Sequence, residues 1–123
     1  ASRIVIRWLI VLSWLCAVRL EGAEKGLASW YGEDHRGKLT ASGKPFNPDG
    51  MTCASWYHPL GTTLKVSHGS RSIIVVVTDR GPNKRFKTRI IDLSRAAFAR
   101  LESPEAGLIP VRTQVIQPTK PRN

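Results

Sequence analysis

The chain has 123 residues, a length that allows one domain and leaves no room for a second hydrophobic core. Its 19 Lys and Arg against 9 Asp and Glu give a formal net charge of +10, which suits nucleic acid, a membrane surface or an acidic polymer as partner. Hydrophobic residues make up 41% and charged residues 23%, a mixture that excludes an intrinsically disordered or collagen-like chain.

The N-terminal segment has the pattern of a secretory leader. Residues 8–18 form an uncharged run after two arginines, which fits the apolar region of a signal peptide and is too short to span a bilayer. We predict a signal peptide over residues 1–23 and export of the remainder. The alternatives are a buried core helix and a signal anchor. Cys16 would carry a lipid anchor, but the bulky Leu15 before it disfavours that alternative.

The remaining chain keeps 16 basic and 8 acidic side chains, a net charge of +8, and a single cysteine, Cys53. One cysteine cannot form an internal disulfide, so the fold must be held together by its hydrophobic core. Because Cys53 lies in an apolar stretch, we expect a buried, unreactive thiol and not a nucleophile. We expect no stable membrane span once the leader is removed.

The first elements of the mature chain are two short strands separated by a long loop. The apolar and aromatic residues 27–31 predict a strand, and residues 51–56 predict a second one. Between them, residues 33–50 are polar and rich in glycine and proline, which predicts a loop. Long loops without secondary structure in small domains are usually functional.

The central part of the chain predicts a β-hairpin. Residues 63–67 alternate in polarity, residues 72–78 form a β-branched run, and Gly69 lies in the turn between them. Because the run Ile73–Val77 is continuously apolar, we expect a strand that is buried on both sides.

The C-terminal part contains one helix between two strands. Residues 88–93 and 111–116 predict strands, and apolar residues at helical spacing predict a short helix over about 94–102 with Ser94 as N-cap. Residues 117–123 predict a flexible tail. About six short strands and one helix favour a mainly β fold, a closed barrel.

Two of the few carboxylates stand out by their context. Asp79 follows the most hydrophobic strand and opens a Gly-Pro turn, and Asp92 lies between apolar residues. A carboxyl group among apolar residues tends to have a raised pKa, which a general acid needs. The structural alternatives are that Asp79 pairs with Arg80 or caps the turn, and that Asp92 accepts hydrogen bonds from the helix that follows it.

The pattern of the other polar and aromatic residues points to a glycan and away from other ligands. The three histidines share no metal-ligand spacing, so we predict neither a metal nor a cofactor. The basic residues are scattered without a nucleic-acid motif, and export argues against nucleic acid. Trp30, Tyr31, Trp56 and Tyr57 could stack on sugar rings of a cell-wall polymer, although several of them could equally be core residues.

Five motifs occur in the order found in the rare lipoprotein A (RlpA) family, which the chain resembles from about residue 26 to 116. They are Gly26-Leu-Ala-Ser-Trp-Tyr-Gly32, Thr40-Ala-Ser-Gly43, Pro59-Leu-Gly-Thr62, Thr78-Asp-Arg-Gly-Pro82 and Ile91-Asp-Leu-Ser-Arg-Ala-Ala97. The resemblance implies a six-stranded double-psi β-barrel over residues 24–116, shared with expansins and barwin-like proteins. It also implies a periplasmic or envelope location, peptidoglycan glycan strands as substrate, and septal division proteins as partners. We expect a monomer.

The family's polar positions are carried over unevenly. Lys44 stands where the family has a glutamate, Ser55 where it has a histidine, and His58 follows three residues later. Asp79 matches the family's aspartate, and the two cleft aspartates of expansins correspond to Asp79 and Asp92. We therefore predict Asp79 and Asp92 as catalytic residues. The predicted substrate-binding residues are Trp30, Tyr31, Thr40, Ser42, Lys44, Ser55, His58 and Arg80.

Two functions follow from this resemblance. The first is a lytic transglycosylase, a carbon–oxygen lyase that cleaves glycan strands to 1,6-anhydro products, with Asp79 as general acid and base and Asp92 raising its pKa if the two lie close. The second is a non-catalytic, expansin-like module that binds or loosens the cell wall. It is motivated by Lys44 and Ser55, because a lysine near the carboxyl group would weaken it as an acid.

Overall fold

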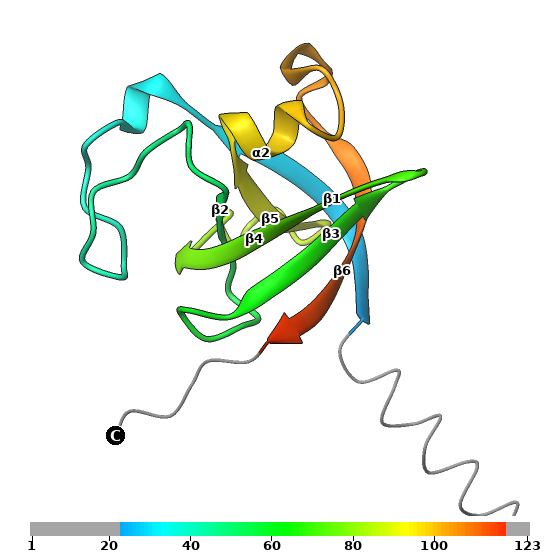
Figure 1. Ribbon diagram of the computed structural model, residues 1–123, viewed down its shortest axis with the longest axis horizontal. Helices are drawn as coiled ribbons and strands as arrows, with labels where there is room; N and C mark the ends of the chain where they lie inside the picture. The colour runs from blue at the N-terminus through cyan, green and yellow to red at the C-terminus, as the bar shows by residue number, and fades with distance from the viewer. Residues whose placement is uncertain (1–22, 118–123) are drawn as a thin grey trace, which may run out of the picture.

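The computed structural model describes residues 23–117, which form a closed barrel of six strands with one short helix over one end (Figure 1). The order around the barrel is β1-β5-β2-β4-β3-β6. This arrangement confirms the predicted closed, mainly β barrel. The elements are β1 (Ala23–Tyr31), η1 (Glu33–His35), β2 (Thr52–Ala54), β3 (Thr63–His68), β4 (Arg71–Asp79), β5 (Arg89–Ser94), α2 (Arg95–Ala99), η2 (Pro104–Ala106) and β6 (Ile109–Gln117).

The barrel brings together strands that are far apart in the sequence. β1 pairs in parallel with β5, and β2 pairs in parallel with β4, whereas the remaining neighbours are antiparallel. β2 therefore lies between β4 and β5, although it precedes both in the chain. This position of β2 decides which residues of the three strands become neighbours in space.

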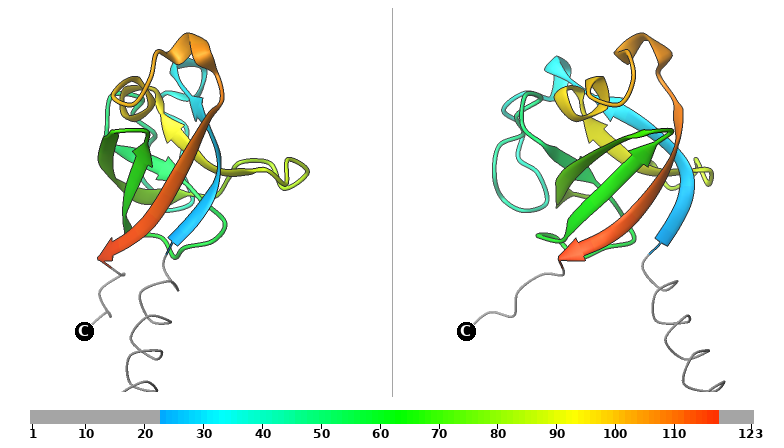
Figure 2. Two further views of the ribbon diagram at one scale, coloured as in Figure 1. Left: turned by 90° about the vertical axis from the view of Figure 1, so that its right-hand side faces the viewer. Right: turned by 45° about the vertical axis from the view of Figure 1, so that its right-hand side comes forward.

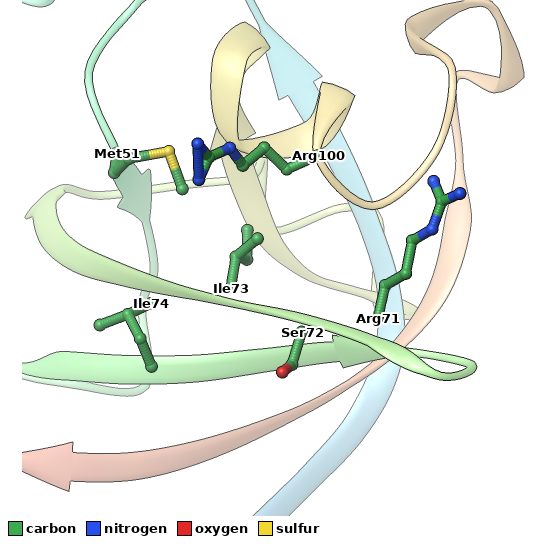
Figure 3. Close-up of a pocket in the computed structure, with 6 residues that line it drawn as sticks. All are labelled: Met51, Arg71, Ser72, Ile73, Ile74 and Arg100. Atoms are coloured by element: carbon green, nitrogen blue, oxygen red, sulfur yellow. The ribbon is translucent and has the colours of Figure 1, made fainter.

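The β3–β4 hairpin is confirmed, but the expectation that β4 is buried on both sides is wrong. Side chains alternate along β4: Ile73, Val75 and Val77 are buried, whereas Ile74 is 49% and Val76 is 37% exposed. Figure 3 shows Ile73 and Ile74 on opposite sides of the strand. The inner face packs into the barrel, and among residues 23–117 no element covers the outer face, so the apolar run does not reflect two-sided burial.

Several elements differ in length from the predictions. β1 begins four residues earlier than residue 27, and β2 is limited to Thr52–Ala54. The helix α2 covers only Arg95–Ala99 of the predicted 94–102, but its N-cap is confirmed, since Ser94 Oγ accepts a hydrogen bond from Ala97 N. The chain then turns into η2, which begins at Pro104.

The core lies inside the barrel and beneath α2. Cys53 is buried and forms no disulfide, and burial raises the pKa of its thiol far above the ordinary range, which confirms the unreactive thiol. The largest buried side chain belongs to Phe98 of α2, which closes one end of the core. The core consists of Ala28, Cys53, Leu64, Val66, Ile73, Val75, Val77, Ile91, Leu93, Ala97, Phe98, Leu101, Ile109 and Val111.

The N-terminal motif contains a glycine at a close approach of two strands. A Cβ atom on Gly26 would lie 2.6 Å from Ile90 Cγ2 and 3.1 Å from the Thr88 carbonyl oxygen. A side chain at this position of β1 would therefore push β5 away, and the parallel β1–β5 pair requires glycine here.

The loop between β1 and β2 folds against the barrel and forms one wall of the site described below. Within it, Leu39 and Pro45 form an isolated antiparallel bridge, and Phe46 is buried. Two backbone hydrogen bonds hold the loop: Ser42 N donates to Thr78 O over 3.0 Å, and Ala96 N donates to Pro48 O over 3.0 Å. The predicted long loop is thus an ordered part of the fold.

Both predicted terminal segments lie outside the described residues, apart from Ala23, which begins β1, and Gln117, which ends β6. Within residues 23–117, no helix has the length and apolar character needed to cross a membrane.

Candidate active site

Asp79 and Asp92 lie on either side of Ala54. In the register of the barrel, Ala54 of β2 is the partner of Asp79 on β4 and of Asp92 on β5. Since adjacent strands are about 4.8 Å apart, the two aspartate Cα atoms are about 10 Å apart across β2. Paired residues direct their side chains to the same face of a sheet, so the two carboxyl groups flank the buried methyl group of Ala54.

Asp79 is held through one of its two oxygens. Asp79 Oδ1 accepts a hydrogen bond from Ala41 N over 3.0 Å and another from Arg80 N over 2.9 Å. Oδ2 receives no hydrogen bond from any residue in the described part of the chain. The carboxyl group is therefore fixed in position, and Oδ2 is available to exchange a proton with a substrate.

The 40–44 loop forms the wall beside Asp79. Thr40 Oγ1 donates to Lys44 O over 2.8 Å and lies 2.7 Å from Ser42 Oγ, which must then donate to Thr40. Lys44 is exposed, and its backbone carbonyl oxygen also accepts a hydrogen bond from Thr40 N. Thr40 is buried and closes this turn, whereas Ser42 and Lys44 face solvent at the rim of the site.

Asp92 is half-buried, and its pKa is raised from the ordinary 3.8 to about 6. Burial is the main cause, because it disfavours the charged form, and the negative charge of Asp79 adds to the effect. A hydrogen bond from Ser29 Oγ to Asp92 Oδ1 over 3.2 Å and the positive charge of Arg89 oppose the shift. The raised pKa expected from the apolar sequence context is thus confirmed for Asp92.

Tyr31 offers its hydroxyl group, and not its ring face, to the site. The Tyr31 ring stacks on the Phe46 ring with centroids 4.1 Å apart. The His35 ring is nearly perpendicular to the Tyr31 ring, with centroids 5.7 Å apart. Burial raises the pKa of Tyr31 far above its ordinary value, and the charges of Asp79 and Asp92 raise it further, so the phenol is neutral. Its buried oxygen has no hydrogen-bond partner among the described residues.

Trp30 is placed differently from its neighbour Tyr31. Its indole Nε1 donates to Pro104 O over 2.8 Å, and its ring lies 6.4 Å from the ring of Phe98. Successive residues of a strand point to opposite faces, so Trp30 packs between the core and η2 while Tyr31 faces the carboxyl groups. The structure therefore does not bring Trp30 to Asp79 and Asp92.

Ser55 and His58 lie in the turn that follows β2, and Arg80, which follows β4, is bonded to this turn. Ser55 is buried, and its N–H donates to the Asp79 carbonyl oxygen over 3.0 Å. The Arg80 guanidinium donates to the carbonyl oxygens of Ser55 and His58, not to the carboxyl group of Asp79. His58 Nε2 lies 3.2 Å from Glu24 Oε1 without hydrogen-bond geometry, so its imidazole is directed to the start of β1 and not to the carboxyl pair.

Sequence reasoning missed the residues that support the two aspartates. Ser29 and Ala41 donate hydrogen bonds to Asp92 and Asp79, and Phe46 holds the ring of Tyr31. Ser29 could have been found, because it is two positions before Tyr31 on the same strand and therefore shares its face. Among residues 23–117, no group of three or more His, Cys, Asp or Glu side chains could hold a metal ion.

Two further hollows lie apart from the carboxyl pair. One, of about 490 Å³, has Arg71 and Arg100 on its rim above Ile74, as Figure 3 shows. A larger one, of about 1110 Å³, follows the outer face of β1, β6 and β3 and includes Lys65 and Arg112. Neither includes Asp79 or Asp92 among its lining residues.

Comparison with known proteins gives consistent matches. A family model described as lytic transglycolase matches residues 23–113. The endolytic peptidoglycan transglycosylase RlpA of Campylobacter jejuni is 41% identical over 93 residues, which cover 74% of this chain and 33% of the relative. The protein of the same name from Vibrio cholerae is 41% identical over 104 residues, covering 80% of this chain and 39% of the relative. The chain thus spans well under half the length of these relatives.

Two solved structures share the fold. The Streptomyces papain inhibitor superposes with a TM-score of 0.64 at 26% identity, covering 79% of this chain and 96% of the inhibitor. An expansin of Clavibacter michiganensis superposes with a TM-score of 0.63 at 25% identity, covering 82% of this chain and 52% of the expansin. With the strand order, these likenesses identify the barrel as a double-psi β-barrel, as the resemblance implied.

Proposed function

Because the chain belongs to the lytic transglycolase family, we propose that it cleaves the glycan strands of peptidoglycan as an endolytic lytic transglycosylase. The observation that supports this most is the pair of carboxyl groups, Asp79 and Asp92, on the two strands that flank β2, where both are register partners of Ala54. The proposed substrate places the protein in the periplasm or cell envelope. Septal division proteins are its expected partners, and it acts as a monomer.

The reaction needs a general acid that gives one proton to the substrate and a general base that takes one proton from it. A carboxylic acid protonates the glycosidic oxygen, the bond from that oxygen to the anomeric carbon breaks, and the 6-hydroxyl of the same sugar attacks that carbon. A carboxylate then takes the proton of the 6-hydroxyl group, and a 1,6-anhydro ring results without consumption of water. Proton balance is complete within the substrate and the carboxyl groups, so the reaction requires no metal or other cofactor.

Asp79 contacts the substrate in this proposal, because its Oδ2 is available while Oδ1 is fixed by two backbone N–H groups. A single carboxyl group could perform both proton transfers, as the sequence suggested for Asp79. The raised pKa of Asp92, about 6, favours a division of roles, in which Asp92 gives the proton and Asp79 accepts the one from the 6-hydroxyl.

A second function is favoured by a separate observation. Lys44 and Ser55 stand at the positions where the family has a glutamate and a histidine. Ser55 is buried, its N–H donates to the Asp79 carbonyl oxygen, and its hydroxyl accepts a hydrogen bond from Tyr57 N. His58 does not replace the missing histidine, because its imidazole is directed to Glu24. A non-catalytic, expansin-like module that binds the cell wall is therefore the alternative.

Digestion of peptide-stripped sacculi, followed by mass spectrometry of the soluble products, tests the proposal. We expect 1,6-anhydro products from the wild type and none above background from Asp79→Asn. Asp34→Asn, which changes an exposed carboxylate outside the pair, is the matched control and should retain the yield. Equal yields from wild type and Asp79→Asn would reject the role of the carboxyl pair. Salt-sensitive binding to sacculi without any products would establish the alternative.

A further inference from the structure

A hollow beside the carboxyl pair carries exposed aromatic side chains. It has a volume of about 380 Å³ and lies between the turn after β2 and the 82–89 loop, which projects from the barrel wall (Figure 2). Trp56 and Tyr57 line it and are 44% and 58% exposed. Large aromatic residues that are exposed side by side mark a binding surface, and sugar rings pack their apolar faces on such rings.

Trp56 and Tyr57 lie in the turn after β2, and hydrogen bonds connect this turn to the end of β4, which carries Asp79. Trp56 Nε1 donates to Pro82 O over 2.6 Å, which fixes the indole against the 82–89 loop. Ser55 N donates to Asp79 O over 3.0 Å, and the Arg80 guanidinium donates to Ser55 O over 2.9 Å. The hollow therefore adjoins the strand end that carries Asp79, and it is also lined by Arg89, whose positive charge acts on Asp92.

The rim of this hollow is positively charged. Lys84, Lys87 and Arg89 line it together with Asn83, and no acidic side chain is among its lining residues. Lys84 Nζ lies 4.3 Å from the centroid of the Trp56 ring. Within residues 23–117, none of the three cations forms an ion pair with a carboxylate. A neutral sugar would gain nothing from this charge, whereas a sugar that bears a carboxylate would.

We propose that this hollow is a subsite for an anionic sugar residue, whose ring packs on the exposed Tyr57 while Lys84, held over the Trp56 ring, and Lys87 bind its carboxylate. The proposal rests on the proposed function, because it takes a peptidoglycan strand as the ligand. In such a strand the anionic sugar is muramic acid with a free lactyl carboxylate. Lys84 already contacts the Trp56 ring, so its ammonium group lies within reach of a carboxylate on a sugar that packs there.

Calorimetric titration with two matched ligands tests this subsite. The first ligand is a peptide-free glycan strand with free lactyl carboxylates, and the second is the same strand with these carboxylates converted to methylamides. All titrations use the full chain in the Asp79→Asn background, so that binding is measured without cleavage. We expect the anionic strand to bind roughly fivefold more tightly at low salt, since each exposed ion pair contributes up to about 1 kcal/mol.

Variants separate the two parts of the proposed subsite. Lys84→Gln/Lys87→Gln should bind both strands equally, whereas Tyr57→Ala should weaken both by roughly tenfold, because the packing surface is lost. Lys25→Gln/Lys65→Gln removes the same charge from strands outside the hollow and should keep the preference for the anionic strand. The subsite is refuted if Lys84→Gln/Lys87→Gln keeps the preference, if the control pair loses it to the same extent, or if Tyr57→Ala binds normally.

Failure of this inference is distinguishable from failure of the proposed function. A preference for the anionic strand that depends on Lys84 and Lys87 supports the subsite even if the wild type yields no anhydro products. Conversely, anhydro products that require Asp79, combined with equal binding of both strands, support the lyase and overturn the subsite.

Discussion

Replacing Asp92 by asparagine should stabilise the fold at neutral pH while it removes a group proposed for catalysis. The folded-state pKa of Asp92 is raised from 3.8 to about 6, so the folded protein binds this proton more tightly than the unfolded chain does. The stability that the protonated form provides is therefore lost as the pH rises from about 4 to about 6. A shift of about two pKa units corresponds to about 3 kcal/mol. This is the amount by which ionised Asp92 destabilises the fold above pH 7.

The asparagine side chain cannot ionise, and its amide oxygen can still accept the hydrogen bond from Ser29. We therefore expect Asp92→Asn to match the wild type near pH 4 and to exceed it at pH 7.5 by roughly 2–3 kcal/mol. Urea unfolding at both pH values measures this difference, which corresponds to a midpoint shift of about 1–2 M. Asp34→Asn, at an exposed position, should show no such pH-dependent gain. The reasoning would be refuted if the Asp92→Asn advantage did not grow with pH, or if the variant were less stable at pH 7.5.

Three further outcomes follow from the contacts of the site. Ser29→Ala removes the hydrogen bond that Ser29 donates to the carboxylate of Asp92, so the pKa of Asp92 should rise by about one unit. NMR titration of the Asp92 carboxyl carbon measures this pKa, and an unchanged value would contradict the hydrogen bond. Gly26→Ala places a methyl group against Ile90 and should lower the free energy of unfolding, measured with urea, by about 1–3 kcal/mol. An unchanged urea midpoint would show that β5 can shift to accept the methyl group without loss of stability. Tyr31→Phe removes a buried hydroxyl without a described partner, so the free energy of unfolding in urea should stay constant or rise by up to about 1 kcal/mol. A clear loss of stability would contradict the absence of a partner for this hydroxyl.

Part of the site was predictable because it depends on local sequence. The position of Asp79 at a strand end follows from the β-branched run before it and the Gly-Pro turn after it. The N-cap role of Ser94 follows from a hydroxyl residue placed before helical spacing. The raised pKa of Asp92 was expected from its apolar neighbours, but Ile91 and Leu93 point into the barrel, whereas Asp92 is half-buried on the opposite face of β5, beside Ser29.

Other parts could not be predicted, because they depend on where side chains point. His58 was predicted as a substrate-binding residue, but the turn after β2 directs its imidazole to Glu24. Trp30 and Tyr31 looked equivalent as aromatic residues, yet the alternation of β1 sends one to η2 and the other to the carboxyl groups. The apolar run of β4 suggested burial on both faces, because composition does not reveal that the outer face of the barrel is open to solvent.

The sequence by itself determined the chemical groups of the site and the strands that carry them, since strand patterns and turn residues act over short distances. Only the tertiary structure decided that Asp79 and Asp92 become neighbours on either side of Ala54. Closure of the barrel inserts β2 between two strands that follow it in the chain, and this register joins residues that no local pattern connects. Burial, which sets the pKa of Asp92, arises from the same closure.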